Sequence, residues 1–142
     1  MSRTLSRLSE LQPELFCEVS PQLAAERGLE NGGWATIISA RAAIEARVLV
    51  TRRMRPLRLA DGAVVHQVGL PYHWGSEGLV TGDVVNDLLP FALDPNVLIQ
   101  ESKVATCDVR AGRRPRGRER IELVDSYRRR AGLDPLDRWE ET

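Results

Sequence analysis

The sequence predicts a protein whose core is mainly β, arranged as a barrel or a sandwich. Three observations lead to this fold class. Short runs rich in β-branched residues alternate with turn residues over residues 15–70 and return at residues 102–110. One short helix in this region carries both start and stop signals. At 142 residues and 42% hydrophobic residues, the chain suffices for one domain with a sizeable core.

The first expected elements are a strand and a helix. Residues 1–12 are polar and predict a loosely ordered segment. Residues 15–20 alternate between apolar and polar, as in a short strand. Ser20 is suited to cap a helix, Pro21 to occupy its first position and Gly28 to end it, so a helix of about two turns follows.

Two β-rich runs come next, residues 34–40 and residues 44–51, after turn residues at 30–33. In the second run every other side chain is apolar, as expected where one face of a strand packs on a core. The residues on that face are Ile44, Ala46, Val48 and Val50.

The middle of the chain is expected to form a hairpin, a long loop and a closing strand. Residues 56–70 predict a hairpin that turns at Asp61 and Gly62. Residues 71–102 contain several glycines and prolines, which predict a structured loop with at most short helical pieces. Residues 102–110 alternate again and should close the sheet.

The composition changes after Arg110. Residues 110–130 carry nine arginines with acidic residues interleaved, and residues 121–132 show helical periodicity. No aromatic platform accompanies the arginines, so a solvated tail that docks a neighbouring domain is favoured over a nucleic-acid-binding arm. The chain is therefore divided into three parts. These are a flexible N-terminal remnant (1–12), a β-barrel unit (13–112) and an Arg-rich, partly helical tail (113–142).

Charge and composition argue against several classes of function. The formal net charge is zero, so no global field attracts nucleic acid or an anionic membrane. No apolar run approaches the ~20 residues that span a bilayer, and no signal-peptide core is present, so a cytoplasmic protein is expected. Cys17 and Cys107 lack metal-binding spacing and are interpreted as reduced thiols. No nucleophile elbow or phosphate loop occurs, although a Cys–His pair in space stays open as an alternative.

Polar and aromatic side chains gather between residues 71 and 103. Tyr72 and Trp74 offer ring faces, and His73 lies between them with two ring nitrogens. Asn86 offers both donors and acceptors, and Lys103, the single lysine of the chain, offers a point charge. This set suits a flat polar ligand such as a purine or a pterin.

A purely structural interpretation of the same segment is equally open at this point. Tyr72 and Trp74 could plug the end of the barrel. Asn86 and Asp87 could cap a turn, because short polar side chains often do so. The residues alone do not separate these two interpretations.

Four segments, taken in order, resemble a known family. They are ELFCEVSPQLAAERGLENGGWATIISARAAIEARVLVT, VHQVGLPYHWG, GDVVNDLLPFALDPN and ESKVATCDVR. Together they resemble the C-terminal molybdopterin-dinucleotide-binding domain of formate dehydrogenase major subunits, over about residues 12–112. The resemblance implies a double-psi β-barrel with short peripheral helices. It also implies that the barrel covers one face of a bis-molybdopterin guanine dinucleotide (bis-MGD) cofactor carrying Mo or W.

The resemblance also implies cofactor contacts at particular positions. Tyr72, His73 and Trp74 match the family's P-F-H-W-G loop, which approaches the pterin. Asn86 matches the asparagine of the family's N-D-L-T motif, which hydrogen-bonds the cofactor. Lys103 matches the basic residue before the last strand. No metal ligand and no catalytic residue is expected within this chain.

The function implied is to cover and position bis-MGD, while the catalytic residues of a formate dehydrogenase lie in an N-terminal part missing here. The chain starts after the family's Thr-Gly-Arg segment and is expected to be inactive alone. Expected partners are the remainder of the major subunit and an iron–sulfur subunit, with neither nucleic acid nor membrane. A homodimer through an unpaired barrel edge is a further expectation. The alternative is a stand-alone interaction or scaffold barrel that no longer binds the cofactor.

Overall fold

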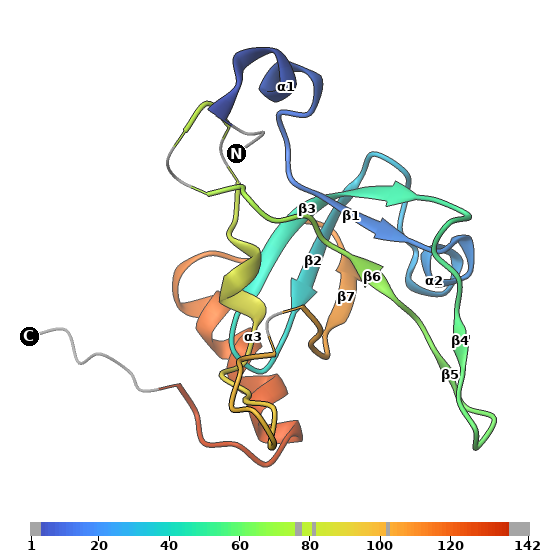
Figure 1. The fold of residues 1–142 in the computed structure, drawn as a ribbon, viewed down its shortest axis with the longest axis vertical. Helices are drawn as coiled ribbons and strands as arrows, with labels where there is room; N and C mark the ends of the chain where they lie inside the picture. The colour runs from blue at the N-terminus through green and yellow to red at the C-terminus, as the bar shows by residue number, and fades with distance from the viewer. Residues whose placement is uncertain (1–3, 76–77, 81, 102, 137–142) are drawn as a thin grey trace, which may run out of the picture.

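The computed structural model describes residues 4–75, 78–80, 82–101 and 103–136. Figure 1 shows a curled, half-barrel sheet with short helices around it and a longer helix near the end of the chain. The predicted fold class is therefore confirmed: a mainly β barrel-type domain with short peripheral helices and a C-terminal helical tail.

The first strand and helix form where their local chemistry predicts them. Strand β1 spans Phe16–Val19 and helix α2 spans Pro21–Arg27. The Ser20 hydroxyl accepts a hydrogen bond from the Leu23 backbone N–H at 3.1 Å, which satisfies a donor that the first helical turn leaves free. Gly28 ends the helix at φ 63°, in the left-handed region that glycine adopts without steric cost.

The main sheet has five strands in the order β6-β1-β3-β2-β7. Strands β2 (Trp34–Ile38) and β3 (Ala43–Val50) form its antiparallel centre. Strand β1 pairs in parallel with β3, whereas β6 (Val68–Gly69) and β7 (Asp108–Ala111) pair antiparallel at the two edges. The parallel pair requires a crossover, which α2 and β2 supply.

The predicted hairpin is confirmed as a separate two-stranded sheet, β4 (Leu57–Arg58) with β5 (Val64–Val65). Asp61 accepts a hydrogen bond from the Ala63 backbone N–H at 2.9 Å, and Gly62 adopts φ 84°. Figure 1 shows this hairpin projecting away from the main sheet.

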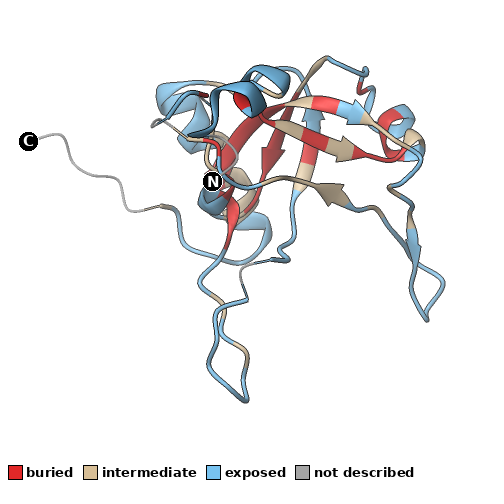
Figure 2. Ribbon diagram, turned by 45° about the horizontal axis from the view of Figure 1, so that its top comes forward, coloured by how far each residue is buried: buried red, intermediate tan, exposed pale blue. Residues whose placement is uncertain are grey.

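The core lies along the central strands, which are buried on both faces. Figure 2 shows buried residues concentrated in the main sheet, while the long loops are exposed. Cys17, Ile37 and Ile44 are essentially inaccessible. Glu45, on the opposite face of β3 from Ile44, is also only 7% exposed. A second layer therefore covers the polar face of this strand as well.

Two expectations about secondary structure are wrong. Helix α1 (Ser6–Leu11) forms in the segment expected to be loosely ordered. The closing strand is shorter than predicted and begins only at Asp108. The reason is register: Asp108 lies opposite Ile38, the last residue of β2, so residues 103–107 extend beyond the strand that could pair with them.

A short helix lies within the long loop, and a longer one follows the last strand. The 3₁₀ helix η2 spans Val85–Leu88, as the expectation of short helical pieces allows. Helix α3 spans Gly117–Arg130 and includes most of the predicted helical segment. Val124 of α3 packs with Ile38 and Ala43 in a small second core. The described part of the tail packs against its own barrel, while docking to a neighbouring domain stays a prediction.

No helix in the part of the chain that the structure describes is long and apolar enough to cross a membrane.

Candidate functional site

Trp74 anchors the loop that was predicted to approach the ligand. Its side chain is 8% exposed, its Nε1–H donates to the Pro13 carbonyl at 3.3 Å, and its ring meets Phe16 edge to face at 6.2 Å. The chain passes close by at Gly82, where an added Cβ would lie 3.3 Å from Trp74 Cδ1. Trp74 therefore fills the core, as the structural interpretation expected, and fixes the loop to β1.

The two residues before Trp74 face solvent. Tyr72 and His73 are exposed. His73 has φ 81°, a conformation that few non-glycine residues adopt and that costs roughly 1–3 kcal/mol. Backbone strain of this kind occurs often where a side chain is held out for binding, and the imidazole shares no hydrogen bond with any residue the structure describes.

Asn86 is held out by the helix that carries it. Val85 and Leu88 of η2 are buried, whereas Asn86 and Asp87 are exposed. The N-cap residue of the helix, Val84, provides no side-chain cap, and the Asn86 carboxamide bonds to no described residue. The interpretation of Asn86 as a turn cap is therefore wrong, since only its backbone carbonyl is used locally.

Asp94 shows what local capping looks like in this chain. Its carboxylate accepts hydrogen bonds from the backbone N–H groups of Asn96 and Val97 at 2.8 and 2.9 Å. Asn86 makes no such bond although it also lies at a turn. Its amide thus remains available to a ligand.

Lys103 follows an ordered loop with an apolar surface, residues 91–101. This loop is closed by a bridge between Leu93 and Gln100 and by a hydrogen bond from the Glu101 N–H to the Ala92 carbonyl. Lys103 is exposed and forms no ion pair within the described residues. The apolar loop and the residue after Lys103 expose large hydrophobic side chains: Phe91, Leu93, Val97, Leu98, Ile99 and Val104.

Three of the predicted contact residues have side chains that form no hydrogen bond or ion pair with a described residue. His73, Asn86 and Lys103 present polar groups to solvent from three successive segments, and no hydrogen bond connects them. Polar groups carried by three separate segments suit an extended ligand rather than a compact one.

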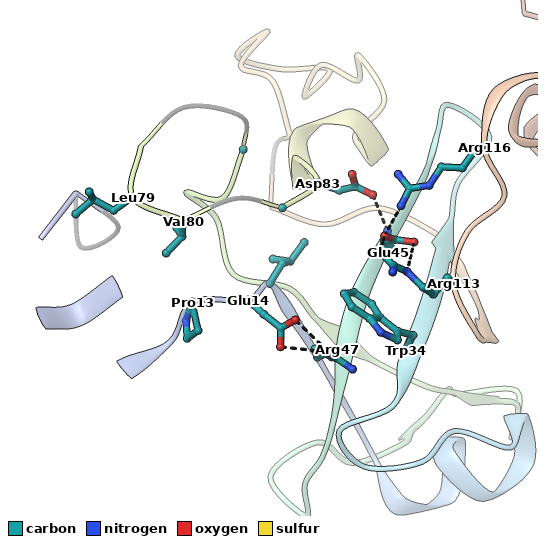
Figure 3. Close-up of a pocket in the computed structure, with 13 residues that line it drawn as sticks. Pro13, Glu14, Trp34, Glu45, Arg47, Leu79, Val80, Asp83, Arg113 and Arg116 are labelled. Atoms are coloured by element: carbon teal, nitrogen blue, oxygen red, sulfur yellow. Dashed lines mark hydrogen bonds and ion pairs between the residues drawn. The ribbon is translucent and has the colours of Figure 1, made fainter. Parts of the chain in front are cut away.

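A charged cluster is the feature that the sequence analysis missed. Figure 3 shows a pocket between the segment around Glu14, strands β2 and β3, and the side chains of Val80 and Asp83. Its volume is about 910 Å³. On its wall Trp34 lies between two guanidinium groups, with Arg47 at 4.1 Å and Arg113 at 4.4 Å from the ring centroid.

Two carboxylates of this cluster are held by arginines of the tail. Glu45 accepts from Arg113 at 2.6 Å and from Arg116 at 2.9 Å. Asp83 accepts two hydrogen bonds from Arg114, at 2.5 and 2.8 Å. Three arginines that might have bound an external polyanion are thus paired within the molecule.

The arginines keep both carboxylates ionised. Burial raises the pKa of Asp83, but the hydrogen bond from Arg114 and the further donors outweigh it, so this pKa lies below its usual range. Burial likewise raises the pKa of Glu45, and the hydrogen bond and charge of Arg113 with the charge of Arg116 lower it overall. The cluster is therefore a structural ion network near neutral pH.

Helix α3 is secured by a second set of contacts. The Tyr127 hydroxyl donates to Asp108 Oδ2 at 2.5 Å, and Arg27 pairs with Asp108 Oδ1 at 3.0 Å. Arg128 Nη1 donates to the Ala40 carbonyl at 2.9 Å. These contacts place the helix at the turn that joins β2 and β3.

The thiols do not support a nucleophilic site. Burial raises the pKa of Cys17 to about 12. The surrounding protein and then the adjacent Asp108 carboxylate raise the pKa of Cys107, although part of its side chain reaches solvent. Since the thiolate is the reactive form, neither cysteine is activated. Within the described ranges no group of three or more His, Cys, Asp or Glu could hold a metal ion.

Comparisons with a family model and with known proteins agree on one family. The family model of the Molydopterin dinucleotide binding domain matches residues 1–106. Formate dehydrogenase 2 subunit alpha (cytochrome c-553) of Nitratidesulfovibrio vulgaris is 40% identical over 109 residues, which is 77% of this chain and 11% of that protein. Formate dehydrogenase subunit alpha of Megalodesulfovibrio gigas is 38% identical over 110 residues, again 77% and 11%.

A third relative extends the same pattern. The nitrate-inducible formate dehydrogenase major subunit of Escherichia coli is 44% identical over 93 residues, which is 65% of this chain and 9% of the relative. The chain thus spans about a tenth of the length of the curated relatives it matches.

Proposed function

This chain belongs to the Molydopterin dinucleotide binding domain family, and we propose that it binds bis-MGD carrying Mo or W as one domain of a formate dehydrogenase. In this proposal residues 13–112 form the cofactor-binding unit, and the catalytic residues lie in another part of the enzyme. The proposal includes a cytoplasmic location.

One observation carries the proposal. Within the family-matched residues, an ordered frame holds His73, Asn86 and Lys103 with their polar groups unpaired and exposed. Leaving so many donors uncommitted gives the fold no stability, but it suits a ligand with ring nitrogens, carbonyls and phosphates.

Each side chain has a role that fits its chemistry. Asn86 donates and accepts along a ring edge, Lys103 faces an anionic group, and His73 supplies a ring nitrogen. Tyr72 offers an exposed ring to stack on the pterin. Trp74 contacts the cofactor only through the edge that its packing leaves accessible, and mainly it holds the loop in place.

The cofactor, when bound, would supply the redox chemistry of formate oxidation. The residues of this chain bind it, orient it and exclude water from one side. Hydrogen bonds from the exposed loop would also tune the potential of the metal, since such outer contacts change the electronics of a bound metal group.

The expected partner is the remainder of the major subunit, with an iron–sulfur subunit as a further component. The apolar loop (residues 91–101) supports this, because large side chains such as Phe91, 74% exposed, are uncovered on the chain alone. A homodimer through edge strand β6 or β7 is the competing use of uncovered surface.

The alternative of a stand-alone interaction barrel is weakened at three arginines of the tail. It assigned binding to the Arg-rich tail, but Arg113, Arg114 and Arg116 are paired with Glu45 and Asp83. Deleting residues 111–142 and measuring partner capture would separate the two ideas. The cofactor proposal expects any loss of capture to follow from loss of fold.

The test is cofactor retention after co-expression with the remainder of the proposed enzyme. Asn86→Ala and Lys103→Ala are each expected to weaken retention of Mo or W and of guanine by about tenfold, because each removes a hydrogen bond or charge contact worth roughly 1.4 kcal/mol. Arg118→Ala is the matched control, since Arg118 lies on the outer face of α3 and pairs only with Glu122. Unchanged metal and guanine content in both variants would overturn the assignment.

A further inference from the structure

The C-terminal tail contacts the loop that carries Asn86, although the tail lies outside the family match at residues 1–106. Gly112 turns the chain back at φ 95°, with its N–H bonded to the Trp34 carbonyl at 2.8 Å and its own carbonyl accepting from Thr36 Oγ1 at 3.0 Å. This turn directs residues 113–116 across the outer face of strands β2 and β3.

Arg114 is the most enclosed of these arginines. Its side chain is 9% exposed, against 56% for Arg113 and 63% for Arg116. Two nitrogens of its guanidinium, Nε and Nη2, donate to the two carboxylate oxygens of Asp83 in a bidentate arrangement. Its backbone N–H also donates to Glu45 Oε2 at 3.2 Å.

Asp83 is at the same time tied to the central sheet. The Glu45 backbone N–H donates to Asp83 Oδ2 at 2.8 Å. One carboxylate thus joins strand β3, the tail and the loop that leads into η2. We call Glu45, Asp83 and Arg114 the tail clamp.

Asp83 lies just before η2 in the chain. The helix begins at Val85, two residues after Asp83, and Asn86 is its second residue. Two backbone hydrogen bonds of 3.1 Å join the helix to its flanking residues, from the Asp87 N–H to the Val84 carbonyl and from the Leu89 N–H to the Asn86 carbonyl. A 3₁₀ helix of four residues is not stable by itself, so anchors outside it must hold its orientation.

We propose that Arg114 is a positioning residue for the cofactor, which acts through Asp83 to orient the Asn86 carboxamide. This inference rests on the proposed function. The buried side chains of Val85 and Leu88 fix which face of η2 points inward, and the tail clamp fixes the start of the helix. The tail thereby becomes part of the cofactor-binding unit without touching the cofactor.

The first test uses the chain alone and needs no cofactor. Hydrogen exchange is measured at the amides of Glu45 and of residues 85–89 in wild type, Arg114→Gln, Arg114→Lys and Arg118→Gln. Arg114→Gln is expected to raise exchange at these amides about tenfold, since it breaks the charge-assisted bonds that hold Asp83 in place. Arg114→Lys should rescue only part of the protection, and Arg118→Gln should change nothing.

A structural role alone would give a different pattern. If Arg114→Gln speeds exchange equally at the β2 amides and at the β3 amides other than Glu45, Arg114 stabilises the whole fold and the inference is wrong. Unchanged exchange at residues 85–89 would also overturn it. Should Arg114→Gln fail to fold, Asp83→Asn, which keeps the shape of the side chain, provides the same comparison.

The second test is a double-mutant cycle on guanine retention in the co-expressed enzyme. If Arg114 acts through Asn86, Arg114→Gln lowers retention in the wild-type background and adds little to Asn86→Ala. Additive losses would contradict the inference. If Asn86→Ala lowers guanine retention and Arg114→Gln does not, the positioning role of Arg114 is wrong and the proposed function stands. If Asn86→Ala has no effect, the proposed role of Asn86 fails, while hydrogen exchange still decides whether Arg114 orders η2.

Discussion

The tail clamp and the exposed loops use polar side chains in opposite ways. In the clamp Glu45 and Asp83 are buried or half-buried, and arginines satisfy both. In the loops, the side chains of His73 and Asn86 are exposed and form no hydrogen bond with another described residue. Paired charges of the first kind hold a fold together, whereas uncommitted groups of the second kind become useful only when a ligand arrives.

The same contrast occurs within three consecutive residues. Tyr72 and His73 face solvent, and Trp74 is packed against Phe16 and bonded to the Pro13 carbonyl. A sequence motif that resembles a ligand-binding loop therefore contains its own anchor. The two kinds of residue can be distinguished by stability, because only the anchor should affect it strongly.

The largest expected effect is on Trp74. Trp74→Ala should lower the free energy of unfolding by about 3–4 kcal/mol, because it leaves a cavity where the indole packs. Urea unfolding measures this change. Tyr72→Ala is the control and should lose less than about 1 kcal/mol. Comparable losses in the two variants would mean that Trp74 is not the anchor.

Asp83 ranks second. Asp83→Ala should cost about 2 kcal/mol, because Arg114 is left with little access to water and no carboxylate partner. Asp94→Ala, which removes only an exposed turn cap, should cost no more than about 1 kcal/mol. Equal losses in urea unfolding would argue that the Asp83–Arg114 pair contributes no more than a surface turn.

The tail clamp also predicts how stability depends on pH. The pKa values of Glu45 and Asp83 are lowered in the folded state, so these groups contribute stability that is present above their unfolded pKa values of about 4. That contribution is lost as the pH falls through the lower folded values. Unfolding in urea from about pH 6 to pH 3 should show the loss, and Asp83→Asn should make the fall shallower. An identical pH profile in the variant would contradict this origin.

The smallest effect is expected at His73, with opposite signs for stability and binding. His73→Gly should stabilise the chain or leave it unchanged within about 1 kcal/mol, because glycine adopts positive φ without strain. The same change should lower guanine retention in the co-expressed enzyme, since it removes a ring nitrogen. A clear loss of stability with full retention would show that His73 serves the fold instead.

The sequence predicted the elements whose signals are local. Ser20 and Gly28 mark the ends of α2, and Asp61 with Gly62 marks the hairpin, because capping and turn chemistry act within a few residues. The mainly β class followed from alternation in the central strands. The resemblance named a loop and an asparagine that the structure holds exposed, but contact of these residues with a cofactor remains a prediction.

The missed features depend on pairing between distant residues. Glu45 and the Arg114 backbone are 69 positions apart, and Asp83 and Arg114 are 31 apart. The sequence of the arginine-rich tail does not indicate which carboxylates pair with its arginines, so the tail was predicted to be solvated. A carboxylate on a β-rich strand was the available signal, because Glu45 sits where a second layer could bury it. The predicted closing strand was too long, because the real strand can pair only as far as β2 extends.

The most direct measurement is an experimental structure of this chain assembled with the rest of the enzyme and its cofactor. The account predicts that Asn86 and Lys103 lie within hydrogen-bonding distance of bis-MGD, with the Asp83–Arg114 pair intact beside η2. A cofactor bound elsewhere, with both side chains still facing solvent, would contradict it.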